Sequence, residues 1–318
     1  MAEFQHEFRG PLLLLAGTAN RPLAEEIARE LGASVGDVTS KRFADGEIFV
    51  RINQNVRGGD VFIVQPTPPP GDNLLELLLL IDAARRASAA RITVVMSYYG
   101  YARQDRKDQP RVAIGAKLVA NLIEAAGADR VLGMDFHAHQ LQGFFDIPVD
   151  HLYAAPVLTS YFSAKAMAGL VVVAPDVGAA KMARGYARRL EASFAIIDKR
   201  RPQQNVAEVV TVVGEVSGRP CLIVDDLIDT AGTLVSAAEG LMERGAAAVY
   251  CAASHALLSG PAVERLERSP IAEVVVTNTL AIEPKKQFSK LTVLSVAGLL
   301  SRAIRYTHSH ESVSQLFD

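Results

Sequence analysis

Ten residues from 224 to 233, Val-Asp-Asp-Leu-Ile-Asp-Thr-Ala-Gly-Thr, combine residue types that could bind a phosphate and a sugar. The apolar run Cys221 to Val224 is typical of a buried parallel strand, and Asp225 and Asp226 follow where that strand should surface. The small and hydroxyl residues after them suit a turn before a helix, whose first N–H groups can bind phosphate. The acidic pair could hold hydroxyls directly or through Mg²⁺. The stretch predicts a phosphorylated-sugar site, although a strand–turn–helix corner would explain two aspartates alone.

Other polar residues also follow predicted strands. His137 and Asp176 each stand just after an apolar run, where ligands bind in open α/β sheets. Imidazole is an unusual but possible partner for Mg²⁺ beside phosphate oxygens and water. Lys199 and Arg201 follow a third strand, and mobile cations there could neutralise charge during polyphosphate transfer. A loop histidine, a turn aspartate and a solvated basic turn are the simpler explanations of each group alone.

Two further segments could bind a nucleotide. Arg103 and Gln104 lie in a charged stretch beside several tyrosines, which could clamp it. Phe43 could stack on a base while Asp45 and Glu47, around an Asp-Gly turn, bind amino or hydroxyl groups. A charged surface loop and a plain hairpin turn are the alternatives. Neither GxxxxGK[ST] nor GxGxxG occurs, which argues against a P-loop kinase.

The composition describes a globular protein. A length of 318 residues, with 49% hydrophobic and 21% charged residues, allows two domains with substantial cores. The net charge of −2 predicts no general attraction to nucleic acid or to an anionic membrane. Cys221 and Cys251 stand in apolar runs and favour a reducing cytoplasm. The leucine-rich segment Leu74 to Ile81, interrupted by Glu76, is too short to span a membrane.

Strands and helices are expected to alternate through both halves, which predicts an α/β fold with mostly parallel sheets flanked by helices. Gly127 precedes His137 by the same ten-residue step that separates Gly245 from His255, an indication of weak internal duplication. The boundary between the halves is expected near residues 150 to 158. Expected strands are 12–16, 48–52, 60–65, 92–96, 131–136, 170–174, 195–197, 221–224, 247–252 and 273–278, and expected helices are 22–31, 73–87, 114–126, 179–190, 233–242, 261–267 and 298–306.

Ten segments, in order over nearly the whole chain, resemble those of the ribose-phosphate pyrophosphokinase (PRPP synthetase) family. They are FADGE, YYGYARQDRK, AKLVANLIE, DFHAHQLQGFFDIPVDHL, APDVG, AIIDKRRP, NVAEV, VDDLIDTAGT, SGPAVER and SVSQLF. The resemblance implies two tandem phosphoribosyltransferase-like (Rossmann-like) domains, residues 9–150 on the ATP side and 151–305 on the ribose 5-phosphate side, and a tail, 306–318. It further implies transfer of the β,γ-pyrophosphoryl group of Mg-ATP to the C1 hydroxyl of ribose 5-phosphate, by a cytoplasmic homo-oligomer of dimers assembled into a hexamer.

The same resemblance implies roles for individual residues. The implied ATP-binding residues are Phe43, Asp45, Gly46, Glu47, Arg103 and Gln104. The implied ribose 5-phosphate-binding residues are Arg201, Asp225, Asp226, Asp229, Thr230, Ala231, Gly232 and Thr233. His137 and Asp176 are the implied Mg²⁺-site residues, and Lys199 and Arg201 the implied catalytic cations of a lid.

Two departures from the family pattern leave its regulation open. Asn55 replaces a common Ser, and Asp108 to Gly115 replaces an ARSREPIT-like run, so phosphate activation and ADP inhibition do not follow from the resemblance. Two other functions are weighed against it. A phosphoribosyltransferase would need one such domain and would have no reason to carry the FADGE and RQD segments. A non-catalytic regulatory subunit would show lost site residues or an insertion near 199–205, and the sequence shows neither.

Overall fold

The computed structural model describes residues 10–200 and 209–316, except for the side chains at 198–200, 209 and 210. The chain divides into two compact units. The first unit contains the residues up to Leu152 together with those from Ala297 onward, and the second runs from Tyr153 to Val296. Each unit has its own sheet and its own apolar core. The predicted α/β class is confirmed.

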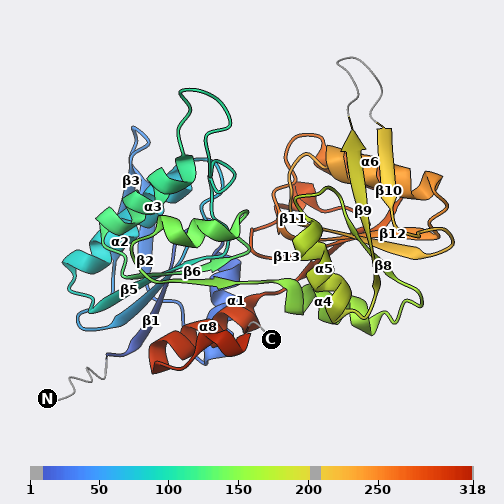
Figure 1. The fold of residues 1–318 in the computed structure, drawn as a ribbon. Helices are drawn as coiled ribbons and strands as arrows, with labels where there is room; N and C mark the ends of the chain where they lie inside the picture. Colours follow the sequence, from blue (N-terminus) through green and yellow to red (C-terminus); the bar gives the residue numbers. More distant parts are fainter. Residues whose placement is uncertain (1–9, 201–208, 317–318) are drawn as a thin grey trace, which may run out of the picture. The chain divides into compact units, whose positions relative to one another are not determined.

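The first unit is built on a five-stranded parallel sheet with the order β1-β4-β5-β6-β7. Its central strands β4 and β5 are mostly apolar and almost entirely buried, because helices cover both faces of the sheet (Figure 1). Asn20 caps the first helix by accepting from the Leu23 N–H, and Gly32 ends it in a left-handed conformation. The elements are β1 (Leu12–Ala16), α1 (Arg21–Leu31), β4 (Asp60–Val64), α2 (Asp72–Arg86), β5 (Arg91–Met96), α3 (Gly115–Ala126), β6 (Arg130–Met134), η1 (His139–Phe144), β7 (Val149–Leu152), α8 (Ala297–Ser309) and η3 (Val313–Leu316).

A separate antiparallel hairpin belongs to this unit. Its strands are β2 (Val38–Arg42) and β3 (Ile48–Ile52), and β3 packs on α2. The turn between them is closed by the Phe43 N–H donating to the Glu47 carbonyl at 2.9 Å and the Gly46 N–H donating to the Phe43 carbonyl at 3.0 Å. Gly46 has φ +98°, a conformation that favours glycine. The Asp-Gly turn predicted from the sequence is confirmed.

The second unit is built on a seven-stranded sheet with the order β10-β9-β8-β11-β12-β13-β14. All neighbouring strands are parallel except β10, which pairs antiparallel with β9 at the edge. The elements are α4 (Ala155–Ala164), β8 (Val171–Ala174), α5 (Ala180–Arg189), β9 (Ser193–Arg200), β10 (Val209–Val213), β11 (Pro220–Ile228), α6 (Gly232–Glu243), β12 (Ala248–Ala256), α7 (Ala262–Arg268), β13 (Ile271–Thr277), η2 (Pro284–Lys286) and β14 (Leu291–Leu294).

The C-terminal end of the chain differs from the predicted domain ranges. The second domain was expected to continue to residue 305, but α8 packs on α1 and belongs to the first unit. The Arg91 guanidinium donates to the Thr307 carbonyl at 3.0 Å, which ties α8 to β5. The reason is physical: α8 buries its apolar residues within the first unit, where it packs on α1, and chain order alone does not say which unit a final helix joins.

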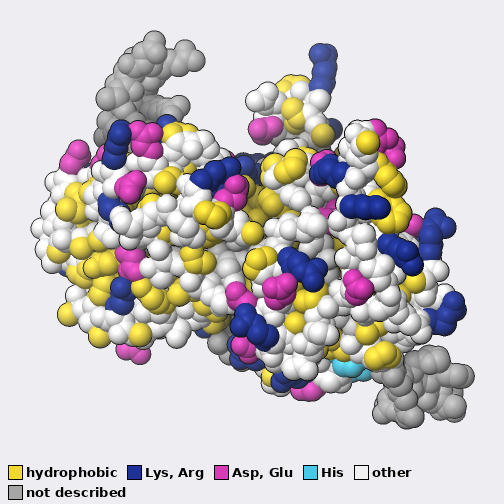
Figure 2. All heavy atoms as spheres, turned by 180° about the vertical axis from the view of Figure 1, so that it is seen from behind, with side chains coloured by type: hydrophobic (Ala, Val, Ile, Leu, Met, Phe, Trp, Pro, Cys, Tyr) yellow, Lys and Arg dark blue, Asp and Glu magenta, His cyan; other side chains and the backbone are white. Residues whose placement is uncertain are grey.

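The surface carries both charges. Figure 2 shows Lys and Arg side chains interspersed with Asp and Glu on the face that it displays. This mixture of charges agrees with the small net charge of −2. None of the helices in the described part of the chain combines the length and apolar character that a membrane span requires.

Candidate active site

The acidic pair lies inside a strand rather than after it. β11 runs through Asp225 and Asp226 to Ile228, and Asp225 pairs with Ala253 of β12. The strand expected from the sequence ends at Val224, because the apolar run stops there. That expectation is wrong, because β11 continues past the apolar core as it approaches the carboxyl edge of the sheet. Both aspartates are half-buried there.

The residues after β11 form the turn expected from the sequence. Ala231 has φ +60° and is buried, and α6 begins at Gly232. Ala231, the residue before the helix, makes no side-chain cap, and the start of an α-helix is a place that favours an anion. The Asp229-Thr230 backbone is held from the side, because the Asp229 carbonyl accepts from the Ser259 N–H at 2.9 Å and the Thr230 carbonyl accepts from Arg265 Nη1 at 3.0 Å.

The carboxylates at this edge influence one another. Burial, together with the negative charges of Asp226 and Asp176, raises the pKa of Asp225 to about 8. Asp176 follows β8, the strand beside β11, and its Oδ1 accepts from the Ala179 N–H at 3.0 Å. The second unit therefore brings together three of the predicted residues, Asp176, Asp225 and Asp226. Among the described residues, no group of three or more metal-ligand side chains is arranged to hold a metal ion.

The predicted ATP-binding turn is exposed in the first unit. The side chain of Phe43 is 48% exposed and meets Phe49 edge to face, with ring centroids 5.5 Å apart. Asp45 Oδ1 accepts from the Glu47 N–H at 3.1 Å, so this carboxylate also shapes the turn. A flat, accessible aromatic ring next to two carboxylates suits an adenine and its amino group.

A second predicted ATP segment lies between β5 and α3. The Gln104 N–H donates to the Tyr101 carbonyl at 2.9 Å, and the Gln104 carbonyl accepts from the Ala116 N–H at 3.2 Å. Arg103 and Gln104 are both exposed. Gln140 Nε2 donates to Asp105 Oδ2 at 3.3 Å, which brings this segment beside the loop that carries His137.

His137 is exposed on a loop whose backbone is fixed from below. The Phe136 N–H donates to His151 Nε2 at 2.8 Å, and the His151 ring, buried, stacks on Phe136 with centroids 4.8 Å apart. The Asp135 N–H donates to the Leu152 carbonyl, and Asp135 has φ +39°. His137 belongs to the first unit and Asp176 to the second.

The predicted catalytic cations Lys199 and Arg201 lie at and beyond the end of β9, where the described residues stop. The strand expected at residues 195–197 is longer in the structure, where β9 continues to Arg200 and its Lys199 pairs with Val210 of β10. The antiparallel partner explains the extension, since a strand that gains a neighbour can carry charged residues at the edge of a sheet. The side chain of Lys199 and the whole of Arg201 lie outside the described residues.

Four residues of the site regions were missed by sequence reasoning. Glu76 was noted only as an interruption of an apolar segment, yet a lone carboxylate on the inner face of a helix is a signal of a buried polar contact. Arg42, Arg265 and His151 give no such signal, because their partners are backbone atoms or distant side chains.

Comparisons with known proteins point to one family. A family model described as the N-terminal domain of ribose phosphate pyrophosphokinase matches residues 12–127, and one described as a phosphoribosyl synthetase-associated domain matches residues 199–318. The ribose-phosphate pyrophosphokinase of Chlorobaculum tepidum is 52% identical over 309 residues, which are 97% of this chain and 95% of that protein. The ribose-phosphate pyrophosphokinase of Bacillus caldolyticus is 50% identical over 319 residues, which cover 100% of both.

A solved structure shows the same architecture. The phosphoribosylpyrophosphate synthetase from Mycobacterium smegmatis has a TM-score of 0.89 to this chain at 45% sequence identity. The match covers 94% of this chain and 99% of that one, so it includes both units.

Proposed function

The chain belongs to the ribose-phosphate pyrophosphokinase family, and we propose how its residues carry out that family's reaction. The enzyme transfers the β,γ-pyrophosphoryl group of ATP to ribose 5-phosphate for nucleotide biosynthesis. The C1 hydroxyl oxygen attacks the β-phosphorus of ATP, and the bond from that phosphorus to the α,β-bridging oxygen breaks. The hydroxyl loses its proton, AMP leaves, and phosphoribosyl pyrophosphate is formed.

Ribose 5-phosphate binds at the carboxyl edge of β11. The 5-phosphate lies against the N–H groups from Asp229 to Thr233, where the start of α6 favours negative charge. Asp225 and Asp226 accept hydrogen bonds from ribose hydroxyls. The acidic pair shortly before a helix N-terminus is the observation that supports this assignment. The carboxylates can accept hydrogen bonds from the sugar hydroxyls, and the nearby helix start favours the negative phosphate.

The carboxylates fit magnesium in the manner usual for phosphate transfer. Mg²⁺ in such sites is held by one or two carboxylates with substrate phosphates and water, so no preformed protein cage is needed. Asp176 would supply a hard oxygen ligand, and the pKa of Asp225 is raised first by burial and then by the negative charges of Asp226 and Asp176, which a cation would offset. His137 is the imidazole that the family resemblance adds. The bound ion would supply charge neutralisation to the polyphosphate.

ATP binds to the first unit. The adenine stacks on Phe43 and contacts Asp45, Gly46 and Glu47, while Arg103 and Gln104 hold the phosphates. Lys199 and Arg201 neutralise the charge that develops on the bridging and terminal oxygens as AMP leaves. Catalysis of this kind depends mainly on positioning and on excluding water.

An assay of products tests the proposal. Purified protein incubated with ATP, Mg²⁺ and ribose 5-phosphate should release AMP and phosphoribosyl pyrophosphate in equal amounts. A phosphoribosyltransferase would release pyrophosphate from phosphoribosyl pyrophosphate and a nucleobase instead, and a regulatory subunit would release nothing. Replacing Asp225 with Asn should lower the rate at least about tenfold, as substitutions at metal and substrate sites commonly do.

The assembly and location of the enzyme follow the family resemblance. We infer a cytoplasmic homo-oligomer in which dimers form a hexamer. Light scattering on the purified protein at micromolar concentration should give about six times the mass of the 34.1 kDa chain, and the mass of a single chain would contradict the assembly.

A further inference from the structure

The hairpin that carries residues 43–47 has little burial to hold it in place. Its two strands form a sheet of their own, and every residue in β2 and β3 is at least partly exposed. A two-stranded hairpin is marginally stable in water unless it packs on other elements. Polar contacts to neighbouring elements must therefore contribute to fixing where the turn lies.

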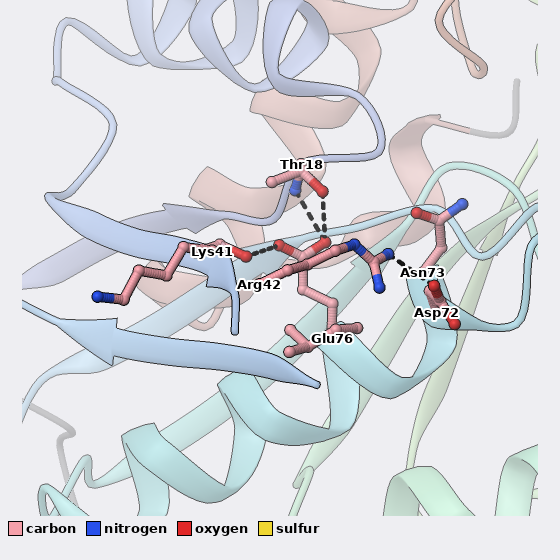
Figure 3. Close-up of a pocket in the computed structure, with 8 residues that line it drawn as sticks. Thr18, Lys41, Arg42, Asp72, Asn73 and Glu76 are labelled. Atoms are coloured by element: carbon pink, nitrogen blue, oxygen red, sulfur yellow. Dashed lines mark hydrogen bonds and ion pairs between the residues drawn. The ribbon is translucent and has the colours of Figure 1, made fainter. Parts of the chain in front are cut away.

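Glu76 of α2 anchors one strand of the hairpin. Its side chain is 3% exposed, and its Oε1 accepts from Ser40 Oγ of β2 at 2.6 Å. Its Oε2 accepts from Thr18 Oγ1 at 2.7 Å (Figure 3) and from Gln65 Nε2 at 2.8 Å. One carboxylate thus joins β2 to the ends of β1 and β4, the strands of the main sheet.

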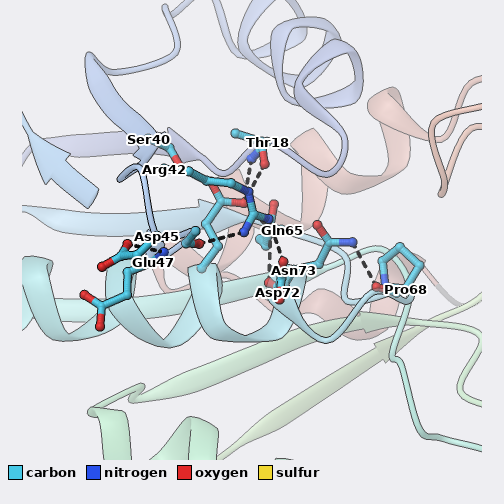
Figure 4. A network of polar contacts seen from close by, with 11 residues as sticks. Thr18, Ser40, Arg42, Asp45, Glu47, Gln65, Pro68, Asp72 and Asn73 are labelled. Carbon is cyan, nitrogen blue, oxygen red and sulfur yellow. Dashed lines mark hydrogen bonds and ion pairs between the residues drawn. The ribbon is translucent and has the colours of Figure 1, made fainter. Parts of the chain in front are cut away.

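Arg42, the last residue of β2, joins the turn itself to the helix. Its Nη1 donates to the Gly46 carbonyl at 3.0 Å, and its Nη2 donates to Asp72 Oδ2 at 2.6 Å. Figure 4 shows Arg42 near the Asp45-Glu47 turn and at the start of α2. The planar guanidinium offers both donors in a fixed geometry, so it sets the turn and the helix at a defined distance.

Arg42 is largely exposed, so its position is set mainly by the hydrogen bonds to Gly46 and Asp72. The side chains of Arg42 and Asp72 are 53% and 47% exposed. They border a polar cavity of about 140 Å³ that Thr18, Ser40 and Glu76 also line. An exposed ion pair beside open space contributes little to overall stability, typically about 0–1 kcal/mol. Its contribution to the position of a short turn can still be large.

We propose that Arg42 and Asp72 form a clamp that positions the ATP-binding turn, with Glu76 as its anchor on the main sheet. The proposal rests on the assignment of residues 43–47 to ATP. Arg42 is a positioning residue, because it acts through the Gly46 carbonyl and not on the nucleotide. Loss of the clamp leaves the turn folded but variable in position, so ATP must order it on binding.

Arg42→Ala tests the clamp. We expect the Kd of a non-hydrolysable ATP analogue and the KM for ATP to rise about 3- to 10-fold, the effect of ordering one or two loop groups. The KM for ribose 5-phosphate and the melting temperature should stay unchanged. Arg42→Lys, which keeps one cation without the fork, should give an intermediate KM for ATP. Asp72→Ala should repeat the effect, and the double variant should be no worse than Arg42→Ala alone.

Two further variants make the result decisive. Arg86→Ala removes an exposed ion pair with Asp82 at the other end of α2, and its KM for ATP should not change. Phe43→Ala tests the ATP assignment itself. If Phe43→Ala weakens ATP binding and Arg42→Ala does not, the clamp is wrong while the site stands. If Phe43→Ala also has no effect, the ATP assignment is wrong and the clamp falls with it. Equal loss of affinity for both substrates, or additive effects in the double variant, also overturns the clamp.

Discussion

Asp225 is a carboxyl group in surroundings that oppose its ionisation. Burial and the charges of Asp226 and Asp176 raise its pKa from 3.8 to about 8. Between these values the folded protein keeps a proton that the unfolded chain releases. The ligand-free protein therefore loses stability as pH rises from 4 towards 8, since the unfolded state then binds fewer protons. A cation or a hydroxyl-bearing substrate relieves the conflict, so the residue is better suited to binding than to stability.

Asp225→Asn should separate these two roles. The amide cannot ionise, and its Oδ1 can still accept from the Asp226 N–H, as the carboxylate does at 2.9 Å. In EDTA and without substrates, the melting temperature of the variant should exceed that of the unaltered protein by about 2–4 °C at pH 8. The difference should shrink towards pH 5, where the Asp225 carboxyl is already protonated.

Thermal unfolding at several pH values measures this difference. Glu264→Gln, which removes an exposed acid on α7 that pairs with Arg268, serves as the control for lost charge. A difference that is independent of pH would show that Asp225 is not the titrating group.

Glu76 is a buried side chain whose two carboxyl oxygens both accept hydrogen bonds. Four donors converge on it, including the Thr18 N–H at 3.1 Å. Glu76→Gln keeps the shape but turns an –NH₂ towards at least one of those donors. We expect the free energy of unfolding to fall by about 1–3 kcal/mol, the cost of leaving buried polar groups unpaired.

Urea unfolding measures the effect of Glu76→Gln. The matched control is Glu25→Gln on α1, which loses only an exposed pair with Arg21 and should change stability by less than about 0.5 kcal/mol. If both variants lower the free energy of unfolding by a similar amount, the buried hydrogen bonds of Glu76 do not contribute specially to stability.

At the scale of elements, α7 braces the loop that leads into α6. Arg265 Nη1 reaches the Thr230 carbonyl, and a side chain added at Gly232 would lie 3.4 Å from the same nitrogen. Arg265→Ala should leave the loop less ordered, which raises the KM for ribose 5-phosphate about 3- to 10-fold and leaves the KM for ATP unchanged.

Steady-state kinetics with each substrate varied in turn checks the effect of Arg265→Ala. Arg268→Ala is the control, because Arg268 lies on the same helix and pairs only with exposed Glu264 among the contacts described for it. If both variants raise the KM equally, α7 matters as a whole and the contact to Thr230 does not.

Elements also show what the sequence could predict. Apolar runs and Gly or Pro boundaries predicted the main buried strands and most helices, because burial on both faces of a parallel strand requires such runs. The ends of β9 and β11 were missed, since strands at the carboxyl edge carry the charged residues Lys199, Asp225 and Asp226. The short edge strands β7 and β14 were missed as well, because half-exposed edges need few apolar residues.

The candidate site also has a part that the sequence predicts and a part that it does not. The loop residues from Asp229 to Thr233 follow from local chemistry, because glycine, threonine and aspartate have defined places in a turn before a helix. The contacts of Arg42, Glu76 and Arg265 join segments up to 58 residues apart. Such pairings depend on how the elements pack, and a single sequence does not contain that information.

At the scale of the whole molecule, the chain leaves the first unit at Leu152 and returns to it at Ala297. The second unit is therefore an insertion between β7 and α8. The returning helix contributes buried residues to the first unit, among them Leu300 and Ile304, which are fully buried. The stability of the first unit consequently depends on a segment that follows the second unit in sequence.

One buried charge fixes this returning helix. Asp60 is fully buried at the start of β4, and it accepts two hydrogen bonds from Arg91, one of them from Nε at 2.8 Å. His308 Nδ1 of α8 lies 2.9 Å from Asp60 Oδ2, and Arg91 also reaches the Thr307 carbonyl. Asp60 is thus the point at which β4, β5 and α8 meet.

Asp60→Ala should loosen α8 before the rest of the first unit. Removing the acid leaves Arg91, 18% exposed, without its carboxylate partner, and breaking such a buried pair costs about 3–5 kcal/mol. Hydrogen exchange should show faster exchange of the α8 amides than of the β5 amides, because the helix loses its His308 contact as well. Asp82→Ala is the control: it removes only an exposed pair with Arg86, so the exchange rates of the α8 amides should not change. Uniform acceleration across the first unit would mean that Asp60 supports the sheet and has no particular hold on the returning helix.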